Sequence, residues 1–292
     1  MSEKRWIPKK VAAIHDLSCF GRCALTVVIP TLSALGAQVI PMPTALLSTH
    51  TGGFTDLYFR DLSEDMDEIA AHFDRLPLEL DAIYSGFLGS EGQIDKVSAF
   101  IDRFGGEGKP VLIDPVMGDD GELYSTYTPE LAEGIKRLCR KADILTPNHT
   151  EACILTGIPY ESTENMSVDE VEELGKRLLL KLSEYGAKKT VITGLPCGDE
   201  LFIFGNSEEG EFCHRERLLH VGYPGTGDLF ASTLLGLLLD GNGFEAAVQG
   251  AAELTTIAIE KTLAAKTPVR DGVLLESCMC EMIAMQQARK RP

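Results

Sequence analysis

Short apolar runs typical of β-strands alternate along the chain with longer segments whose apolar residues recur at helical spacing. The predicted strands cover 10–14, 38–41, 81–86, 110–114, 142–145 and 189–193, and a predicted hairpin covers 201–205 and 210–214. The predicted helices cover 25–35, 63–73, 94–104, 168–184, 228–239 and 244–263. The chain therefore has the strand–helix order that is typical of an α/β protein.

This order predicts the architecture. A strand, a helix and a second strand form a right-handed crossover, which gives parallel strands with helices on both faces of the sheet. We therefore expect a three-layer αβα sandwich around a mainly parallel sheet. There is no low-complexity linker, internal repeat or convincing boundary, so we expect one domain over residues 1–292.

Several chemically useful residues lie just beyond the predicted strands. In folds of this kind, ligands bind at the carboxyl ends of the strands. The residues at these ends are Asp16, Gly86, Asp114, Asn148 and Thr193. We expect them to converge on one cleft, although they are far apart in the sequence.

The most informative segment is the glycine-rich turn at 222–228, which leads into an almost wholly apolar helix. Gly225 and Gly227 allow a tight turn and close approach of a ligand to the backbone. Because the first N–H groups of a helix lack intrahelical partners and face the positive end of the helix dipole, such a turn can bind an anion. The alternative is an ordinary loop before a buried helix.

Asp228 places a carboxylate where that anion would bind, which indicates chemistry rather than passive binding. It could take a proton from a hydroxyl group that attacks a phosphoryl group held by the neighbouring amides. We expect the helix N-terminus to keep Asp228 ionised. The alternative is that Asp228 only caps the helix.

Two further acidic motifs follow predicted strands. Asp114 and Asp119 flank a tight turn, where Asp114 is well placed to hold Mg²⁺ directly or through water. Asn148 and Glu151 have the spacing of a helix capping box. Glu151 could also order metal-bound water beside a phosphate, and the two roles are compatible.

Smaller residues mark a possible pocket for an organic substrate. Thr51 and Gly52 follow a run of small and apolar residues and predict a loop over a small-molecule pocket, whereas we interpret His50 as structural. Asp16 and Ser18 end the first predicted strand. They either contact a substrate or only terminate that strand.

Composition narrows the function classes. The 292 residues carry a net charge of −17, so we expect no nucleic-acid partner and no anionic membrane partner. The first ten residues are polar and basic, which does not predict a signal peptide, and no apolar run has transmembrane length. The eight scattered cysteines include no C-x-x-C pair, which favours reduced thiols and a cytoplasmic protein.

Taken together, these segments resemble a known family. The segments Gly225-Thr226-Gly227-Asp228, Asn148-x-x-Glu151 and 114–119 resemble the ribokinase superfamily. The segments Pro41-x-x-Thr44-x-x-x-Ser48-x-His50-Thr51-Gly52, 85–89 and 142–148 are similar to pyridoxal kinases. The similarity runs in order from about Val11 to about Leu263, and an ordered set is more specific than any single motif.

The resemblance implies a ribokinase-like kinase that transfers the γ-phosphate of ATP to the 5′-hydroxyl of pyridoxal, pyridoxine or pyridoxamine. It implies that Asp228 is the base and that the amides of Gly225, Thr226 and Gly227 form the anion hole. It also implies Mg²⁺ as cofactor, ATP as co-substrate, a homodimer and, in many members, a monovalent cation. The remaining implied ligand contacts are Asp114 and Glu151 for Mg²⁺ and the ATP phosphates, Asn148 and Thr193 for ATP, and Asp16, Ser18, Thr51, Gly52 and Phe87 for the vitamer.

One departure from that family concerns the substrate. Pyridoxal kinases typically have Ile-Gln-Ser where this chain has Ile14-His15-Asp16, and the serine meets the substrate ring. Asp16 leaves open which vitamer is preferred. Two alternatives also remain open, namely a hydroxymethylpyrimidine kinase of thiamine synthesis and a non-catalytic vitamin-binding or regulatory protein.

Overall fold

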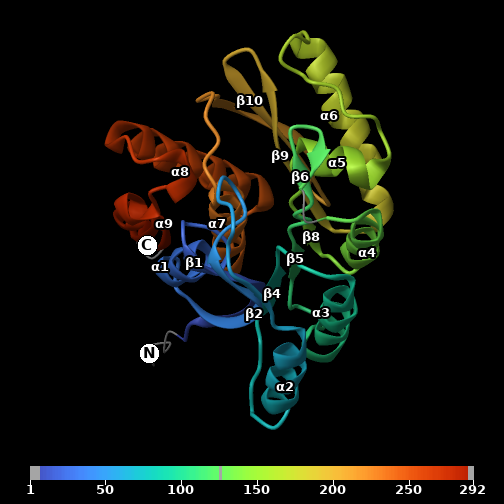
Figure 1. The fold of residues 1–292 in the computed structure, drawn as a ribbon. Helices are drawn as coiled ribbons and strands as arrows, with labels where there is room; N and C mark the ends of the chain where they lie inside the picture. Colours follow the sequence, from blue (N-terminus) through green and yellow to red (C-terminus); the bar gives the residue numbers. More distant parts are fainter. Residues whose placement is uncertain (1–6, 125–126, 289–292) are drawn as a thin grey trace, which may run out of the picture.

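In the computed structural model, which describes residues 7–124 and 127–288, one nine-stranded sheet runs through the molecule in the order β11-β10-β9-β8-β5-β4-β1-β2-β3 (Figure 1). The strands are β1 (Lys9–Phe20), β2 (Ala37–Thr49), β3 (Phe59–Asp61), β4 (Ala82–Ser85), β5 (Val111–Ile113), β8 (Ile144–Leu145), β9 (Lys189–Cys197), β10 (Glu200–Ser207) and β11 (Gly210–Arg217). The six strands from β9 to β2 in this order are parallel, whereas β10, β11 and β3 join through antiparallel pairs.

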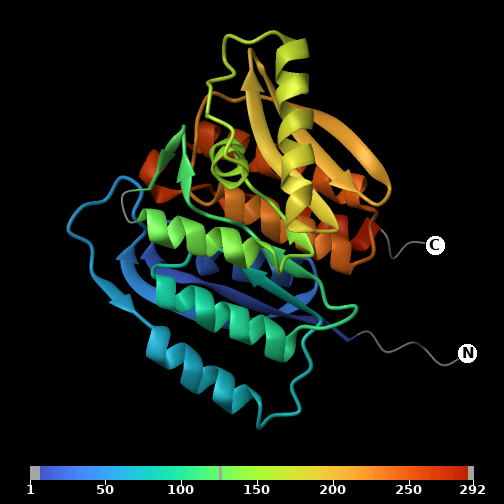
Figure 2. The same cartoon turned by 90° about the vertical axis from the view of Figure 1, so that its right-hand side faces the viewer.

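The helices cover both faces of this sheet (Figures 1 and 2). One layer holds α2 (Ser63–Phe73), α3 (Glu91–Phe104), α4 (Pro129–Cys139), α5 (His149–Thr156) and α6 (Val168–Leu182). The other layer holds α1 (Leu25–Ala34), α7 (Thr226–Leu239), α8 (Phe244–Ala265) and α9 (Met279–Ala288). A small hairpin of β6 (Gly118–Asp119) and β7 (Glu122–Leu123) stands apart from the sheet.

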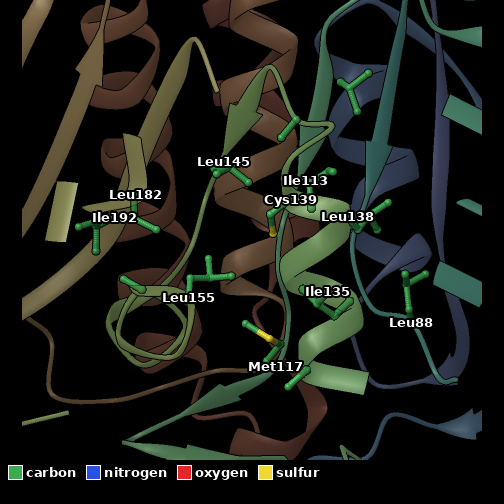
Figure 3. Close-up of a cluster of buried hydrophobic side chains, with 14 of the residues drawn as sticks. Leu88, Ile113, Met117, Ile135, Leu138, Cys139, Leu145, Leu155, Leu182 and Ile192 are labelled. Carbon is green, nitrogen blue, oxygen red and sulfur yellow. The ribbon is translucent and has the colours of Figure 1, made fainter. Parts of the chain in front are cut away.

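The alternation of side chains along β1 divides the core in two. Successive residues of a strand point to opposite faces. Ala12 and Ile14 therefore join the core beneath α2 to α6, part of which Figure 3 shows, whereas Val11 and Ala13 join the core beneath α1, α7 and α8. Because the central strands are buried on both faces, their middle parts are mainly apolar, as is typical of parallel sheets. The expected three-layer αβα sandwich is confirmed.

The structure lengthens several predicted strands and adds elements that were not predicted. β1 and β2 continue past their predicted ends because they still pair with each other up to Phe20 opposite Thr49, although this part of β1 is polar. α4 was not predicted, although Thr128 accepts a hydrogen bond from Leu131 N–H at its N-terminus. α9 follows the two helices that were expected to close the chain. In the described part of the chain, no helix is both long and apolar enough to cross a membrane.

Gly175 shows how closely the helices approach the sheet. A Cβ atom at Gly175 would lie 2.4 Å from the ring of Phe204, which is 1% exposed and cannot move aside. Glycine inside a helix is normally unfavourable by about 1 kcal/mol relative to alanine. Here the close contact between α6 and β10 outweighs that preference.

We therefore predict that Gly175→Ala lowers the free energy of unfolding by about 1–3 kcal/mol, the usual cost of overpacking a core. Gly92 of α3 has open space around it and is the matched control, so Gly92→Ala should be neutral or stabilising. Urea unfolding of both variants measures the difference. Equal stabilisation by the two substitutions would contradict this account of the packing.

Candidate active site

The carboxyl ends of β1, β4, β5, β8 and β9 meet the N-terminus of α7, because parallel strands end at the same edge of the sheet. Backbone hydrogen bonds connect neighbouring strand ends. Asp114 N–H donates to Ser85 O at 2.9 Å, and Thr193 N–H donates to Pro147 O at 3.0 Å. Segments that are far apart in the sequence thus form one rim.

The turn before α7 requires glycine at Gly225. This residue has a φ of 85°, and a Cβ atom there would lie 2.4 Å from the carbonyl oxygen of Arg22. Thr226 N–H donates to Tyr223 O at 3.3 Å, so one of the expected anion-binding amides already has a partner. The space beside Gly227 is open, and the N–H groups of Gly227 and Asp228 lie in the first helical turn, where no intrahelical acceptor exists.

Asp228 uses one carboxylate oxygen structurally. Its Oδ2 accepts a hydrogen bond from Ala24 N–H at 2.8 Å and lies 3.6 Å from Cys23 Sγ. Burial raises the pKa of Asp228 above its ordinary value, and the Ala24 bond offsets only part of this effect. The helix N-terminus therefore does not dominate the pKa of Asp228, contrary to the expectation from the sequence. A raised pKa makes this carboxylate a stronger proton acceptor.

Asp114 is the second buried carboxylate of the site. It is 8% exposed, and burial raises its pKa to about 8, with a further contribution from the negative charge of Asp228. The negative charge of Asp228 therefore disfavours the ionisation of Asp114. A cation between them and the substrate phosphates would relieve that repulsion.

Asn148 and Glu151 form a complete capping box at the start of α5. Asn148 Oδ1 accepts from Glu151 N–H at 2.9 Å, and Glu151 Oε2 accepts from Asn148 N–H at 2.8 Å. Glu151 Oε1 also accepts from Met117 N–H, and Asn148 Nδ2 donates to Gly118 O. The box therefore fixes the 114–119 turn as well as the helix. Burial and then the charge of Asp114 raise the pKa of Glu151.

This arrangement fits a Mg²⁺ ion that takes only one ligand directly from the protein. Among residues 7–124 and 127–288, no group of three or more His, Cys, Asp or Glu side chains is placed to hold a metal by itself. Asp114 can offer a direct oxygen ligand, whereas both oxygens of Glu151 already accept backbone hydrogen bonds. A metal held by one carboxylate, substrate phosphates and water is the usual Mg²⁺ arrangement.

Asp16 and Ser18 lie together at the end of β1. The Ser18 hydroxyl donates to Asp16 Oδ2 at 2.8 Å, and the strand register shifts between His15 and Leu17. Burial raises the pKa of Asp16 to about 6, although the Ser18 bond lowers it and the charge of Asp228 raises it further. Asp16 is therefore electrostatically coupled to the proposed base.

Thr51 and Gly52 lie on an exposed loop, and His50 anchors that loop. His50 Nε2 donates to Arg270 O at 2.7 Å, and its Nδ1 accepts from Gly52 N–H at 3.1 Å. A side chain at Gly52 would come within 3.9 Å of Pro224 in the glycine-rich turn. The loop thus stands beside the turn, and these contacts give His50 the anchoring role proposed for it.

Phe87 follows β4 and is half buried. Its ring meets the ring of Tyr127 edge to face at 5.9 Å, and its carbonyl accepts from the Thr44 hydroxyl. This places an aromatic surface at the rim formed by β2 and β4. Tyr127 was not among the predicted site residues, because only the position of α4 brings it to Phe87.

Thr193 lines a cavity of about 180 Å³ on the other side of α7. Thr226 and Gly227 form one wall, and the wall formed by α8 and the β9–β11 strands is mainly apolar. Its remaining lining residues include Leu201, Ile203, Val221, Phe230, Ala252 and Ile259. An apolar slot that opens onto an anion-binding turn suits a flat ring system attached to phosphates.

Sequence reasoning missed the residues that hold Asp228. Ala24 has the unusual values φ 51° and ψ −130°, which direct its N–H to the carboxylate. Nothing in the local sequence of Cys23 and Ala24 indicates this conformation. The substitution of His15 for the usual glutamine was visible, but its position beside Asp228 was not.

Comparisons with known proteins identify the family of this chain. The sequence profile of the family described as phosphomethylpyrimidine kinase matches residues 27–270. The pyridoxine/pyridoxal/pyridoxamine kinase of Bordetella avium is 30% identical over 269 residues, which cover 86% of this chain and 85% of that protein.

Two solved structures are similar over nearly the whole chain. One, described as a phosphomethylpyrimidine kinase from Bacteroides thetaiotaomicron in a form with pyridoxal, is 37% identical, has a TM-score of 0.88 and covers 94% of this chain and 96% of its own. The pyridoxal kinase of Lactobacillus plantarum is 29% identical, with a TM-score of 0.84, and covers 96% and 98%. This chain therefore belongs to the phosphomethylpyrimidine kinase family and has the ribokinase-like fold of the pyridoxal kinases.

Proposed function

We propose that the protein transfers the γ-phosphate of ATP to the 5′-hydroxyl of a vitamin B6 compound, namely pyridoxal, pyridoxine or pyridoxamine. The observation that carries this proposal is the position of Asp228. Its side chain is only 12% exposed between a helix N-terminus and the strand ends, with Oδ2 held and Oδ1 uncommitted to any hydrogen bond among the described residues. The B6 kinase relatives support the choice of substrate.

The chemistry needs positioning more than a strong base. In phosphoryl transfer, most of the catalytic effect comes from alignment and from neutralising charge on the phosphoryl oxygens. Asp228 accepts the proton of the attacking hydroxyl, and the N–H groups of Gly225, Thr226 and Gly227 bind the developing negative charge at the positive end of α7, once Thr226 N–H has released Tyr223 O. The open space at Gly227 leaves room for phosphate oxygens.

The site also needs a counter-charge, because the protein has a net charge of −17 and lacks a phosphate-binding lysine motif. We infer that Asp114 holds Mg²⁺ and that Glu151 orients its water. The metal supplies charge neutralisation for the ATP phosphates. Asn148 contributes by fixing both the helix start and the 114–119 turn.

The two ligands occupy opposite sides of Asp228 in this proposal. The vitamer lies between Asp16, Ser18, Phe87 and the loop of Thr51 and Gly52. The nucleotide lies along Thr193, in the apolar cavity beside Gly227. Transfer then takes place across the N-terminus of α7.

We further propose that residues 1–292 form a single kinase domain that works as a cytoplasmic homodimer. The continuous nine-stranded sheet supports a single domain. The free cysteines are consistent with a reducing compartment. A monovalent cation remains part of the proposal by resemblance alone.

A substrate screen separates this function from its alternatives. The family description and the Bacteroides neighbour favour hydroxymethylpyrimidine as the second candidate substrate. A coupled ADP-release assay with the three B6 vitamers and hydroxymethylpyrimidine should give the highest kcat/KM with a B6 vitamer. Preference for the pyrimidine would replace the substrate assignment, and the absence of any turnover would favour a binding protein.

Asp228→Asn should lower kcat by about 10²–10⁴-fold, the usual contribution of a general base. The amide keeps the size of the side chain, so the melting temperature and the Kd for ATP should change little. Steady-state kinetics and calorimetry provide the measurements. A variant that keeps more than about a third of the wild-type kcat would exclude Asp228 as the base.

Activity should disappear in excess chelator and return with Mg²⁺ or Mn²⁺. Asp114→Asn should increase the Mg²⁺ concentration needed for half-maximal rate by about tenfold or more, because it removes a charged ligand from the site. The exposed Asp95→Asn on α3 is the matched control and should leave this concentration unchanged. Full activity in chelator would overturn the metal assignment.

Asp16→Ser should shift the ratio of kcat/KM for pyridoxamine over pyridoxal toward pyridoxal, by about 1–3 kcal/mol of discrimination. Since the pKa of Asp16 is about 6, its carboxylate is ionised at pH 7.5 and favours a cationic amine, and the wild-type preference should weaken as pH falls through 6. Asp16→Asn isolates the effect of charge and should shift the ratio in the same direction. An unchanged ratio would mean that Asp16 does not face the substrate.

A further inference from the structure

His15 is a fully buried histidine directly behind the proposed base. It lies on β1 with 0% of its surface exposed, and its Nδ1 is 3.9 Å from Asp228 Oδ1. Its ring meets Tyr84 edge to face at 4.3 Å. A Cβ atom at Gly86 would lie 2.4 Å from the same nitrogen, His15 Nδ1. Gly86 does not have a positive φ, so the ring of His15 is what excludes a side chain there.

In this packing, the polar atoms of the His15 ring make no hydrogen bonds within the described part of the chain. Neither ring nitrogen has a hydrogen-bond partner among the described residues. A buried polar group without a partner costs about 1–3 kcal/mol. Burial also lowers the pKa of His15 to about 3, so the ring is neutral and has one N–H donor and one acceptor. An unpaired N–H is rarer in buried sites than an unpaired acceptor, which favours the Nδ1–H form facing Asp228.

We propose that His15 is a positioning residue, whose Nδ1–H donates a hydrogen bond to Asp228 Oδ1 when the substrate hydroxyl binds. The inference rests on the proposed role of Asp228 as base. The present separation is about 1 Å longer than a hydrogen bond, and catalytic hydrogen bonds are commonly long before substrate binds. A small rotation of the Asp228 side chain closes it.

The geometry explains why the second donor matters. Ala24 N–H holds only Oδ2, so the carboxylate can still pivot about that contact. A donor on Oδ1 fixes its plane and leaves the second lone pair of Oδ1 for the substrate proton. Because the imidazole is neutral, it orients the carboxylate without forming an ion pair that would weaken the base.

The test compares His15→Leu with His15→Asn. Leucine removes the donor, and we expect kcat to fall about 10–100-fold, the scale of a small misplacement of a reacting group, with KM for both substrates nearly unchanged. Asparagine places an amide N–H near the position of Nδ1 and should recover most of the lost kcat. Thr31→Val is the control. It removes a different buried and unpartnered polar group, the hydroxyl of Thr31 on α1, and should keep wild-type kcat.

A purely structural role predicts a different pattern. If His15 were only structural, any loss of kcat in His15→Leu would come with a lower melting temperature. Under the positioning role, the melting temperature should not fall, because leucine removes only two unpartnered nitrogens, and kcat falls in a stable variant. Wild-type kcat in His15→Leu, or an equal loss in folded His15→Asn, would overturn the proposal. Should His15→Leu fail to fold, Gly86→Ala displaces the ring and should also lower kcat, and wild-type kcat in that variant would refute the role.

A double-mutant cycle separates this inference from the proposed function. In the Asp228→Asn background, His15→Leu should not lower the residual rate further, because both changes act on the same carboxylate. Independent, multiplicative losses would refute the positioning role. If Asp228→Asn stays active, the assignment of the base fails; if Asp228→Asn is inactive while His15→Leu keeps full kcat, only the role of His15 fails.

Discussion

The hydrogen bond from Ala24 N–H to Asp228 Oδ2 is the contact on which the site depends. It joins the loop after β1 to the first turn of α7, two segments separated by 204 residues along the chain. Because the strands of a parallel sheet end at one edge, this single contact brings the helix N-terminus over the ends of β4, β5 and β8 as well. Because of this convergence, the charge of Asp228 raises the pKa of Asp114, and the charge of Asp114 raises the pKa of Glu151.

The fold was largely predictable because its elements are locally encoded. Apolar runs such as 110–114 and helical spacing such as 63–73 correspond to β5 and α2. The extension of β1 through Asp16 and Ser18 could not be predicted, because polar residues do not indicate a strand. Only pairing with β2 keeps that segment extended. α9 was missed for a similar reason, since its place depends on packing against α1.

Some local features of the candidate site could be predicted from the sequence, but its pKa shifts could not. Glycines at 225 and 227 and a carboxylate at Asp228 follow from local sequence, and the capping box of Asn148 and Glu151 was recognised by its spacing. The raised pKa of Asp228 could not be predicted, because it depends on burial by segments that are distant in the chain. The relation of His15 to Asp228 likewise requires tertiary structure.

The contact between Cys23 and Asp228 also has a consequence for thiol chemistry. Oxidants and alkylating agents attack thiolates, not protonated thiols. Burial and the charge of Asp228 raise the pKa of Cys23 well above its ordinary value, so its sulfur stays protonated. The exposed Cys19, Cys213 and Cys280 meet such reagents first. Burial and the charge of the proposed base thus together keep the neighbouring thiol protonated and slow to react with oxidants.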